Sequence, residues 1–300
     1  MGVLRTGLAA VVGAATTAVV RRGLAGSVPG GVERWTRTNH RGEPVSMLEG
    51  PAVAAGLVAG TLVGPGAGRA RAATALATSA AGAFGVVDDL AEDTTTRTKG
   101  LRGHLGALAQ GRLTTGGLKV LGIGASALLA AAVGTPRRGS VAGHVTDVVV
   151  NGALVAGTAN LVNLLDLRPG RALKASALLS LPVVAAPGAA GTGALLGTAA
   201  VAAPADLGER DMLGDGGANA LGAWVGARWA LGAPRAARVV ALGGVVALTL
   251  ASEKVSFSAV VERTGWLRRI DAIGRRPAEP ATPVAPAVEP DPTPGAGPTG

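Results

Sequence analysis

Apolar residues along the chain fall into nine runs close to the length that a helix needs to cross a lipid bilayer. The runs occupy residues 3–20, 51–67, 72–88, 117–135, 141–163, 173–187, 188–204, 216–233 and 236–251. A spanning helix needs roughly 20 apolar residues, within a range near 17–25. The pattern therefore predicts an all-α polytopic membrane protein with about nine or ten transmembrane helices.

Three polar segments interrupt these runs, and each of them carries aspartate. The first begins at Asp88-Asp89, the second spans residues 160–174 and contains Asp166, and the third spans residues 212–222 and contains Asp215. Carboxylates at the ends of membrane helices are costly, so they usually mark a site for a cation, a proton or a phosphate. The three segments are the first candidates for functional chemistry.

The pattern also divides the chain into three parts. Residues 1–251 hold the apolar runs and form the predicted transmembrane domain. Residues 252–276 are too charged to span, but their apolar residues could form one stripe, which predicts an amphipathic segment on the membrane surface. Residues 277–300 are rich in Pro, Ala, Gly and Thr, which predicts a disordered tail.

Basic residues gather in alternate loops, on the same side as the three aspartate segments. Because cytoplasmic loops carry an excess of Lys and Arg, this side is predicted to face the cytoplasm. The aspartate motifs and the distribution of basic residues are independent features of the sequence, so the common side of the three segments indicates a single site. Three GxxxG spacings, Gly60–Gly64, Gly193–Gly197 and Gly222–Gly226, are weak signs of close helix packing in lipid.

The net charge of +9 raises nucleic acid as a partner, but the basic residues lie between apolar runs and not on one soluble face. Anionic lipid headgroups or phosphate-bearing substrates are therefore the expected partners, and nucleic acid is not. The chain has no cysteine, which excludes disulfides and thiolate metal sites. Its Ala, Gly and Arg bias is typical of a bacterium with a high-GC genome.

The residue types in the polar segments suit transfer of a phosphoryl-linked group between two anions. That reaction needs a divalent cation, carboxylates that hold it, and cationic groups for the phosphates. Asn160, Asn163 and Asp166 are spaced three apart and would share one helix face, where they could line a cavity. Oxygen ligands of this kind suit Mg²⁺ or Mn²⁺. The four candidate carboxylates are Asp88, Asp89, Asp166 and Asp215.

The order of the motifs, DD, KGL, NxxNLxD and GDxGxxxLG, resembles that of the polyprenyl-phosphate N-acetylhexosamine-1-phosphate transferases (the MraY and WecA types) over roughly residues 30–230. The resemblance implies Mg²⁺-dependent transfer of an amino-sugar-1-phosphate from a UDP-sugar to undecaprenyl or decaprenyl phosphate, with release of UMP. It implies a multi-pass enzyme of the bacterial inner membrane, acting in cell-envelope glycan synthesis such as that of peptidoglycan, with its active site facing the cytoplasm. The resemblance is also the sole ground for considering a homodimer.

The resemblance also assigns roles position by position. The paired aspartates of the family match Asp88 and Asp89, and the family's magnesium-ligating aspartate matches Asp215. Asp89 is a second candidate metal ligand. Asp88, Asp89 and Asp215 are accordingly the expected catalytic residues. The expected substrate-binding residues are Lys99, His104, Asn160, Asn163, Asp166, Arg168 and Arg171.

Two other functions stay open at this point. Pro169 stands where the family has a second aspartate, Gly106 stands where it has a lysine, and its histidine-bearing loop near the C-terminus has no counterpart. These departures favour a divergent member, or a non-catalytic protein of the same fold that binds lipid phosphate or an envelope partner. An ion-coupled transporter would instead place its acids near the middle of broken helices, whereas these acids are predicted at helix ends.

Overall fold

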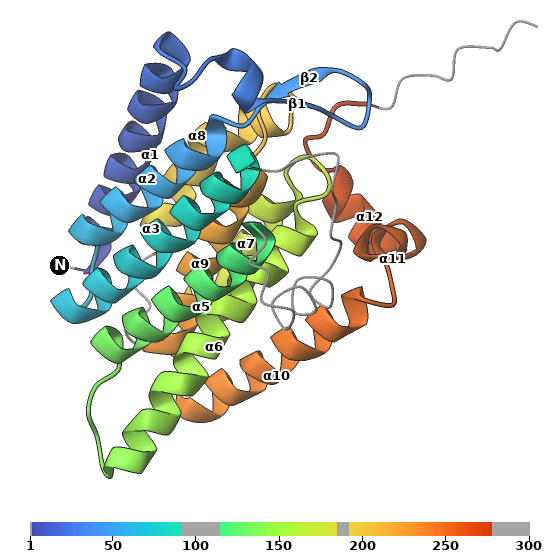
Figure 1. Cartoon of the computed structure of the whole chain (residues 1–300). Helices are drawn as coiled ribbons and strands as arrows, with labels where there is room; N and C mark the ends of the chain where they lie inside the picture. The colour runs from blue at the N-terminus through green and yellow to red at the C-terminus, as the bar shows by residue number, and fades with distance from the viewer. Residues whose placement is uncertain (1, 92–114, 185–191, 278–300) are drawn as a thin grey trace, which may run out of the picture.

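A computed structural model describes residues 2–91, 115–184 and 192–277, which are largely helical (Figure 1). Within these ranges one short 3-10 helix, η1 (Val32–Trp35), precedes a small hairpin, and the rest of the regular structure is α-helical. The α-helices are α1 (Gly2–Gly26), α2 (Glu49–Val63), α3 (Gly68–Ala91), α5 (Thr115–Gly134), α6 (Val141–Leu165), α7 (Arg171–Val184), α8 (Gly193–Asp206), α9 (Gly214–Gly232), α10 (Arg235–Ser252), α11 (Phe257–Arg263) and α12 (Gly265–Ala272).

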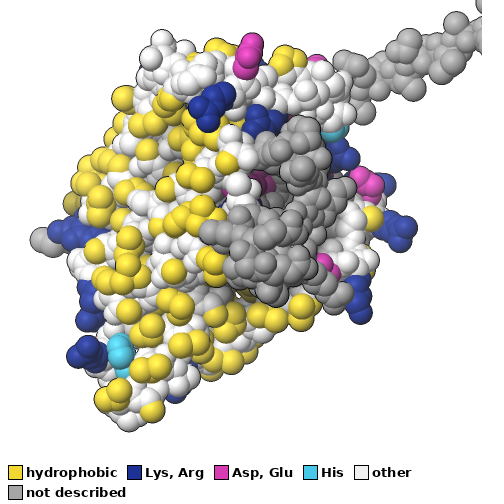
Figure 2. All heavy atoms as spheres, in the orientation of Figure 1, with side chains coloured by type: hydrophobic (Ala, Val, Ile, Leu, Met, Phe, Trp, Pro, Cys, Tyr) yellow, Lys and Arg dark blue, Asp and Glu magenta, His cyan; other side chains and the backbone are white. Residues whose placement is uncertain are grey.

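Each of the nine apolar runs overlaps one of the helices from α1 to α10, so the predicted helical fold is confirmed. Among the described helices, α1, α3, α5, α6 and α10 are long and apolar enough to cross a membrane. The apolar helix α2 has 15 residues, and α7 and α8 have 14 each, which is short of a full span. Figure 2 shows hydrophobic side chains spread over one broad face, with Lys and Arg mostly at its margins.

Close contacts between backbones hold the bundle together at two of the GxxxG pairs. A Cβ added to Gly193 would meet the Thr6 carbonyl of α1, and one added to Gly197 would meet the Ala10 carbonyl. On α9, Gly222 and Gly226 lie in the same way against α6. Small residues let helices approach this closely in lipid, so the spacing marked real packing surfaces.

We expect Gly197→Ala to lower stability, because the new methyl would push α8 away from α1. Overpacking of this kind costs about 1–3 kcal/mol. The matched control is Gly124→Ala on α5, where an added Cβ meets nothing within 4 Å. Thermal unfolding in detergent should show a lower Tm for the first variant and an unchanged or higher Tm for the second. Equal melting temperatures would contradict the packing described here.

A short hairpin in the described part of the chain was not predicted by the all-α pattern. Strands β1 (Thr36–Thr38) and β2 (Pro44–Ser46) pair antiparallel, and the Asn39 side chain closes their loop by accepting backbone hydrogen bonds from Arg41 and Glu43, both at 2.9 Å. The hairpin is joined to the loop between α8 and α9: Ser46 N–H donates to the Arg210 carbonyl at 3.1 Å. This places the hairpin at the end of the bundle where the polar segments lie.

The segment after α10 folds back as α11 and α12 and lies at the same end (Figure 1). Its anchor is the buried Arg171, whose Nε donates to Asp271 Oδ1 at 2.7 Å and whose Nη1 donates to Ser258 Oγ at 2.9 Å. Trp266 is 63% exposed on the outer side. Placement of this segment on a membrane surface stays a prediction, and the predicted tail, apart from Pro277, lies outside the described residues.

Candidate active site

The first turn of α9 is built around the carboxylate of Asp89. Gly214 enters the helix at φ 57°, a left-handed conformation that favours glycine. This turn directs the N–H groups of Asp215 and Gly216 to Asp89 Oδ1 and Oδ2, at 3.0 and 2.9 Å. A carboxylate at a helix N-terminus satisfies free amides and is stabilised by the helix dipole. Asp89 at the end of α3 therefore fixes where α9 begins.

Lys119, in the second turn of α5, lies between the other two aspartates. Its Nζ is 2.7 Å from Asp88 Oδ2 and also forms a short ion pair with Asp215 Oδ2. The lysine side chain is 17% exposed, and the aspartate side chains are 16% and 28% exposed, respectively. Ion pairs in such partly desolvated surroundings are stronger than those at the surface. The structure thus brings the first and third polar segments together around one cation.

An apolar groove of about 330 Å³ leads to this cluster. Its walls come from α5, α6 and α10 and include Ile123, Val245 and Leu250. Its described lining also includes five polar side chains: Lys119, Thr249, Asn160, Asn163 and Asn219. The last of these donates from Nδ2 to the Asp215 carbonyl at 2.8 Å. An apolar channel that ends in an ammonium group and amides suits a long hydrocarbon chain with an anionic head.

A second cavity, of about 410 Å³, lies beside the hairpin. We call it the acidic pocket because its lining includes Asp166, Asp206, Glu209 and Asp211. Two of these acids are neutralised: Arg21 binds Asp211 through two hydrogen bonds of 2.8 and 2.5 Å, and Arg41 Nε donates to Glu209 Oε1 at 3.0 Å. The carboxylate of Asp206 is buried, and its Oδ2 has no hydrogen-bond partner among the described residues.

Asp166 caps the C-terminus of α6 and is held close to other negative charges. Burial, followed by the charges of Asp206, Asp215 and Asp89, raises the pKa of Asp166 well above its ordinary value. An acid with a raised pKa in the folded state costs no stability below its unfolded pKa, near 4, and costs progressively more as the pH rises above it. At neutral pH, the burial of Asp166 near other acids therefore lowers the stability of the folded protein.

We expect Asp166→Asn to raise the Tm at neutral pH, because the amide keeps the shape and removes the charge. A gain of about 1 kcal/mol corresponds to roughly 2–4 °C in a protein of this size. The difference from the wild type should shrink as the pH approaches 4. Asp147→Asn is the control, since Asp147 lies near the other end of α6 and is paired with Arg235 at 3.1 Å. If Asp166→Asn lowers the Tm at every pH, the charge of Asp166 does not destabilise the protein.

The structure brings five of the ten predicted site residues together, and the other five lie elsewhere or outside the described residues. Asp88, Asp89 and Asp215 form one cluster, and Asn160 and Asn163 line the groove that reaches it. Asp166 and Arg168 line the acidic pocket instead, and Arg171 is paired with Asp271. Lys99 and His104 lie outside the described residues.

Three contributors to the site were not predicted from the sequence. Lys119 belongs to none of the motifs, although a lone lysine near the start of an apolar run is itself a signal of a functional residue. Asn219 sits four residues after Asp215, on the same helix face. Arg21 and its partner Asp211 are 190 positions apart, and no local pattern connects them.

The carboxylates fit a Mg²⁺ ion only in part. Among the described residues, no group of three or more His, Cys, Asp or Glu side chains is arranged to hold a metal. Both oxygens of Asp89 accept backbone amides, and Lys119 lies between Asp88 and Asp215. Mg²⁺ is often held by one or two carboxylates together with substrate phosphates, and Asp215 is the better placed of the two predicted ligands for that role.

Comparison with known proteins adds no relative: the chain matches no family model and no curated protein.

Proposed function

We propose that the protein is a membrane transferase that moves an amino-sugar-1-phosphate from a UDP-sugar to a polyprenyl phosphate and releases UMP. The observation that carries the proposal is the apolar groove between α5, α6 and α10, which ends at Lys119 and the aspartates around it. This arrangement combines a channel for a hydrocarbon tail with charged groups for phosphate chemistry. The sequence resemblance to the polyprenyl-phosphate transferases is the second support for the proposal.

In the proposed reaction, an oxygen of the lipid phosphate attacks the phosphorus that carries the sugar. The bond from that phosphorus to UMP breaks, and the product is a lipid-linked diphosphate sugar. Lys119 would stabilise negative charge on the phosphates, and Asp88, 2.7 Å from Lys119, would hold its ammonium group in position. The amides of Asn160, Asn163 and Asn219 would donate to phosphate or sugar oxygens at the end of the groove. A bound Mg²⁺, held at Asp215, would neutralise the donor diphosphate.

The proposal includes a bacterial inner-membrane location with nine or ten spans and a site on the cytoplasmic side. The positions of the acids support an enzyme over a transporter, because Asp88 and Asp89 lie near the end of α3 and Asp215 lies in the first turn of α9. A transporter would hold them near mid-helix.

One observation favours a second candidate, a non-catalytic protein that binds lipid phosphate. Lys119 neutralises Asp88 and Asp215 internally, and the described residues hold no complete metal site. In such a protein the groove and the ammonium group would bind the lipid, and the aspartates would only position the lysine.

The test is release of UMP by the purified protein with undecaprenyl phosphate and Mg²⁺. The assay supplies three kinds of donor separately: UDP-N-acetylglucosamine, other UDP-amino sugars and UDP-N-acetylmuramoyl-pentapeptide. Asp215→Asn is the variant expected to be inactive, and Asp147→Asn is the matched control, because it replaces an acid remote from the site. We expect release that requires the lipid and Asp215 but not Asp147. No release with any of these donors, by folded protein that still binds undecaprenyl phosphate, would favour the non-catalytic function.

A further inference from the structure

A third cavity, of about 250 Å³, lies between the hairpin, the turn after α6 and the two C-terminal helices. We call it the arginine pocket because four arginines line it: Arg168, Arg171, Arg268 and Arg275. Among the described residues, the acids in its lining are Glu262 and Asp271, and His40 lies at the hairpin side. Four guanidinium groups against two carboxylates leave the pocket with an excess of positive charge.

The pairing inside the pocket does not remove this excess. Arg171 and Arg275 both bind Asp271, with Nε–Oδ1 and Nη1–Oδ2 distances of 2.7 and 2.8 Å. These contacts use both oxygens of that carboxylate. The guanidinium groups of Arg168 and Arg268 have no hydrogen bond or ion pair to any other residue in the described ranges. These two guanidinium groups are therefore available to bind a ligand.

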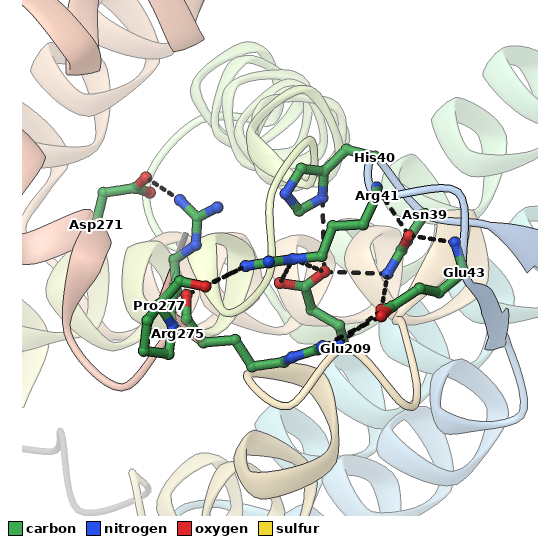
Figure 3. A network of polar contacts seen from close by, with 9 residues as sticks. Asn39, His40, Arg41, Glu43, Glu209, Asp271, Arg275 and Pro277 are labelled. Atoms are coloured by element: carbon green, nitrogen blue, oxygen red, sulfur yellow. Dashed lines mark hydrogen bonds and ion pairs between the residues drawn. The ribbon is translucent and has the colours of Figure 1, made fainter. Parts of the chain in front are cut away.

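Polar contacts beside the pocket join the hairpin to the C-terminal segment, as Figure 3 shows. Arg41 on the hairpin donates to the carbonyls of Arg276 and Pro277 at 3.3 and 2.9 Å, and Arg276 Nη1 pairs with Glu43 Oε2 at 2.6 Å. The hairpin and the end of the C-terminal segment are thus tied together on one side. These contacts restrain the two backbone segments that border the pocket, which reduces the conformational entropy that those segments lose when a ligand binds.

His40 adds a polar group whose charge state suits this environment. Burial is the main cause that lowers the pKa of His40, and the charges of Arg168, Arg275 and Arg41 lower it further against the opposing effect of Glu209. A neutral imidazole offers one donor and one acceptor without adding to the repulsion between the arginines.

We propose that the arginine pocket is a binding site for a phosphate-bearing anion. Guanidinium groups bind phosphate through paired, charge-assisted hydrogen bonds. Arg168 and Arg268, which line one cavity, have guanidinium groups that can form such bonds. The arginine pocket has no lining residue in common with the apolar groove, but it shares His40 and Arg168 with the acidic pocket. The site is thus distinct from the cluster at Lys119, and it stands on its own geometry whether or not the protein is a transferase.

The experiment measures binding of pyrophosphate by calorimetry to the full-length protein in phosphatidylcholine nanodiscs. The test variant is Arg168→Gln/Arg268→Gln, and Arg268→Gln alone serves if the double variant does not fold. The matched control, Arg263→Gln/Arg269→Gln, removes the same charge from two exposed arginines of α11 and α12 that do not line the pocket. We expect the double variant to weaken the Kd by at least about tenfold and the control to change it by less than about twofold.

Two further arms identify the source of the phosphate. Nanodiscs that contain phosphatidylglycerol will compete with pyrophosphate if the natural ligand is a lipid headgroup. UMP and UDP will bind more tightly than pyrophosphate if it is a soluble nucleotide. Either result supports the site. No pyrophosphate binding by the wild type, or an equal loss in the test and control variants, would overturn it.

Discussion

Replacing Lys119 with glutamine should reduce UMP release by about 10²–10³-fold, the range typical of removing one preorganised charge that stabilises a transition state. The expected loss is large because Lys119 is the one cation that contacts both Asp88 and Asp215 among the described residues. Without it, two mostly buried carboxylates would repel one another and the approaching phosphates. Lys119→Arg should recover part of the activity, since it restores the charge with a different shape.

The control for this prediction is Lys254→Gln, which removes a lysine from an exposed position just after α10. Its rate of UMP release should stay close to that of the wild type. Initial rates with saturating undecaprenyl phosphate separate a slower reaction from weaker lipid binding. If Lys119→Gln keeps a rate within about threefold of Lys254→Gln, the ammonium group has no catalytic role.

Replacing Asp271 with alanine should destabilise the protein by about 3 kcal/mol or more, because it leaves a buried arginine without its partner. Arg171 is 6% exposed and makes two hydrogen bonds to this carboxylate, of 2.7 and 3.1 Å. The loss should release α11 and α12 from the bundle. Limited digestion with trypsin should then cut between residues 257 and 276 faster than in the wild type, and the Tm should fall.

The matched variant for this prediction is Arg171→Leu/Asp271→Leu, which removes both charges and keeps apolar bulk. It should be more stable than Asp271→Ala, because no charge is left buried. Arg275→Ala, at the edge of the same cluster, should cost less than Asp271→Ala. If the double variant is the least stable of the three, the cost at Asp271 comes from lost packing and not from the unpaired charge of Arg171.

Low pH should weaken the same ion pair between Arg171 and Asp271. Burial tends to raise the pKa of Asp271, but Arg171, and then Arg275 and Lys174, outweigh burial and hold the pKa below its ordinary value. A lowered pKa means that the ion pair contributes its full stability above pH 4 or so, and that this contribution is lost as the pH falls further.

Most of the helical fold followed from apolar spacing, because a run near 20 residues long has few alternatives to a helix in lipid. The hairpin did not follow, since each of its strands has three residues and no apolar alternation marks them. Its one local signal was the turn at Asn39 and Gly42, the latter at φ 83°. Short strands held by a loop far along the chain leave little trace in a sequence.

The sequence predicted the candidate site best where motif residues lie close together. Asp88 and Asp215 are such a pair, because both contact Lys119. It was less predictable where a side chain has another partner. Arg171 has the charge that phosphate binding requires, but its guanidinium is used to hold Asp271. Whether a basic residue is free for a ligand depends on such long-range pairs, and spacing along the chain does not report them.

The hydrogen bonds of Asp89 change how mutations in the aspartate pair must be interpreted. Asp89→Asn can accept only through one oxygen, so it would loosen the first turn of α9 and displace Asp215, whatever part Asp89 plays in the reaction. An inactive Asp89 variant is therefore ambiguous evidence for chemistry. Asp88 contacts Lys119 and does not bind the α9 amides that Asp89 holds, so its replacement leaves that helix start in place. Of these two adjacent and chemically identical residues, only Asp88 can be replaced without removing a cap from α9.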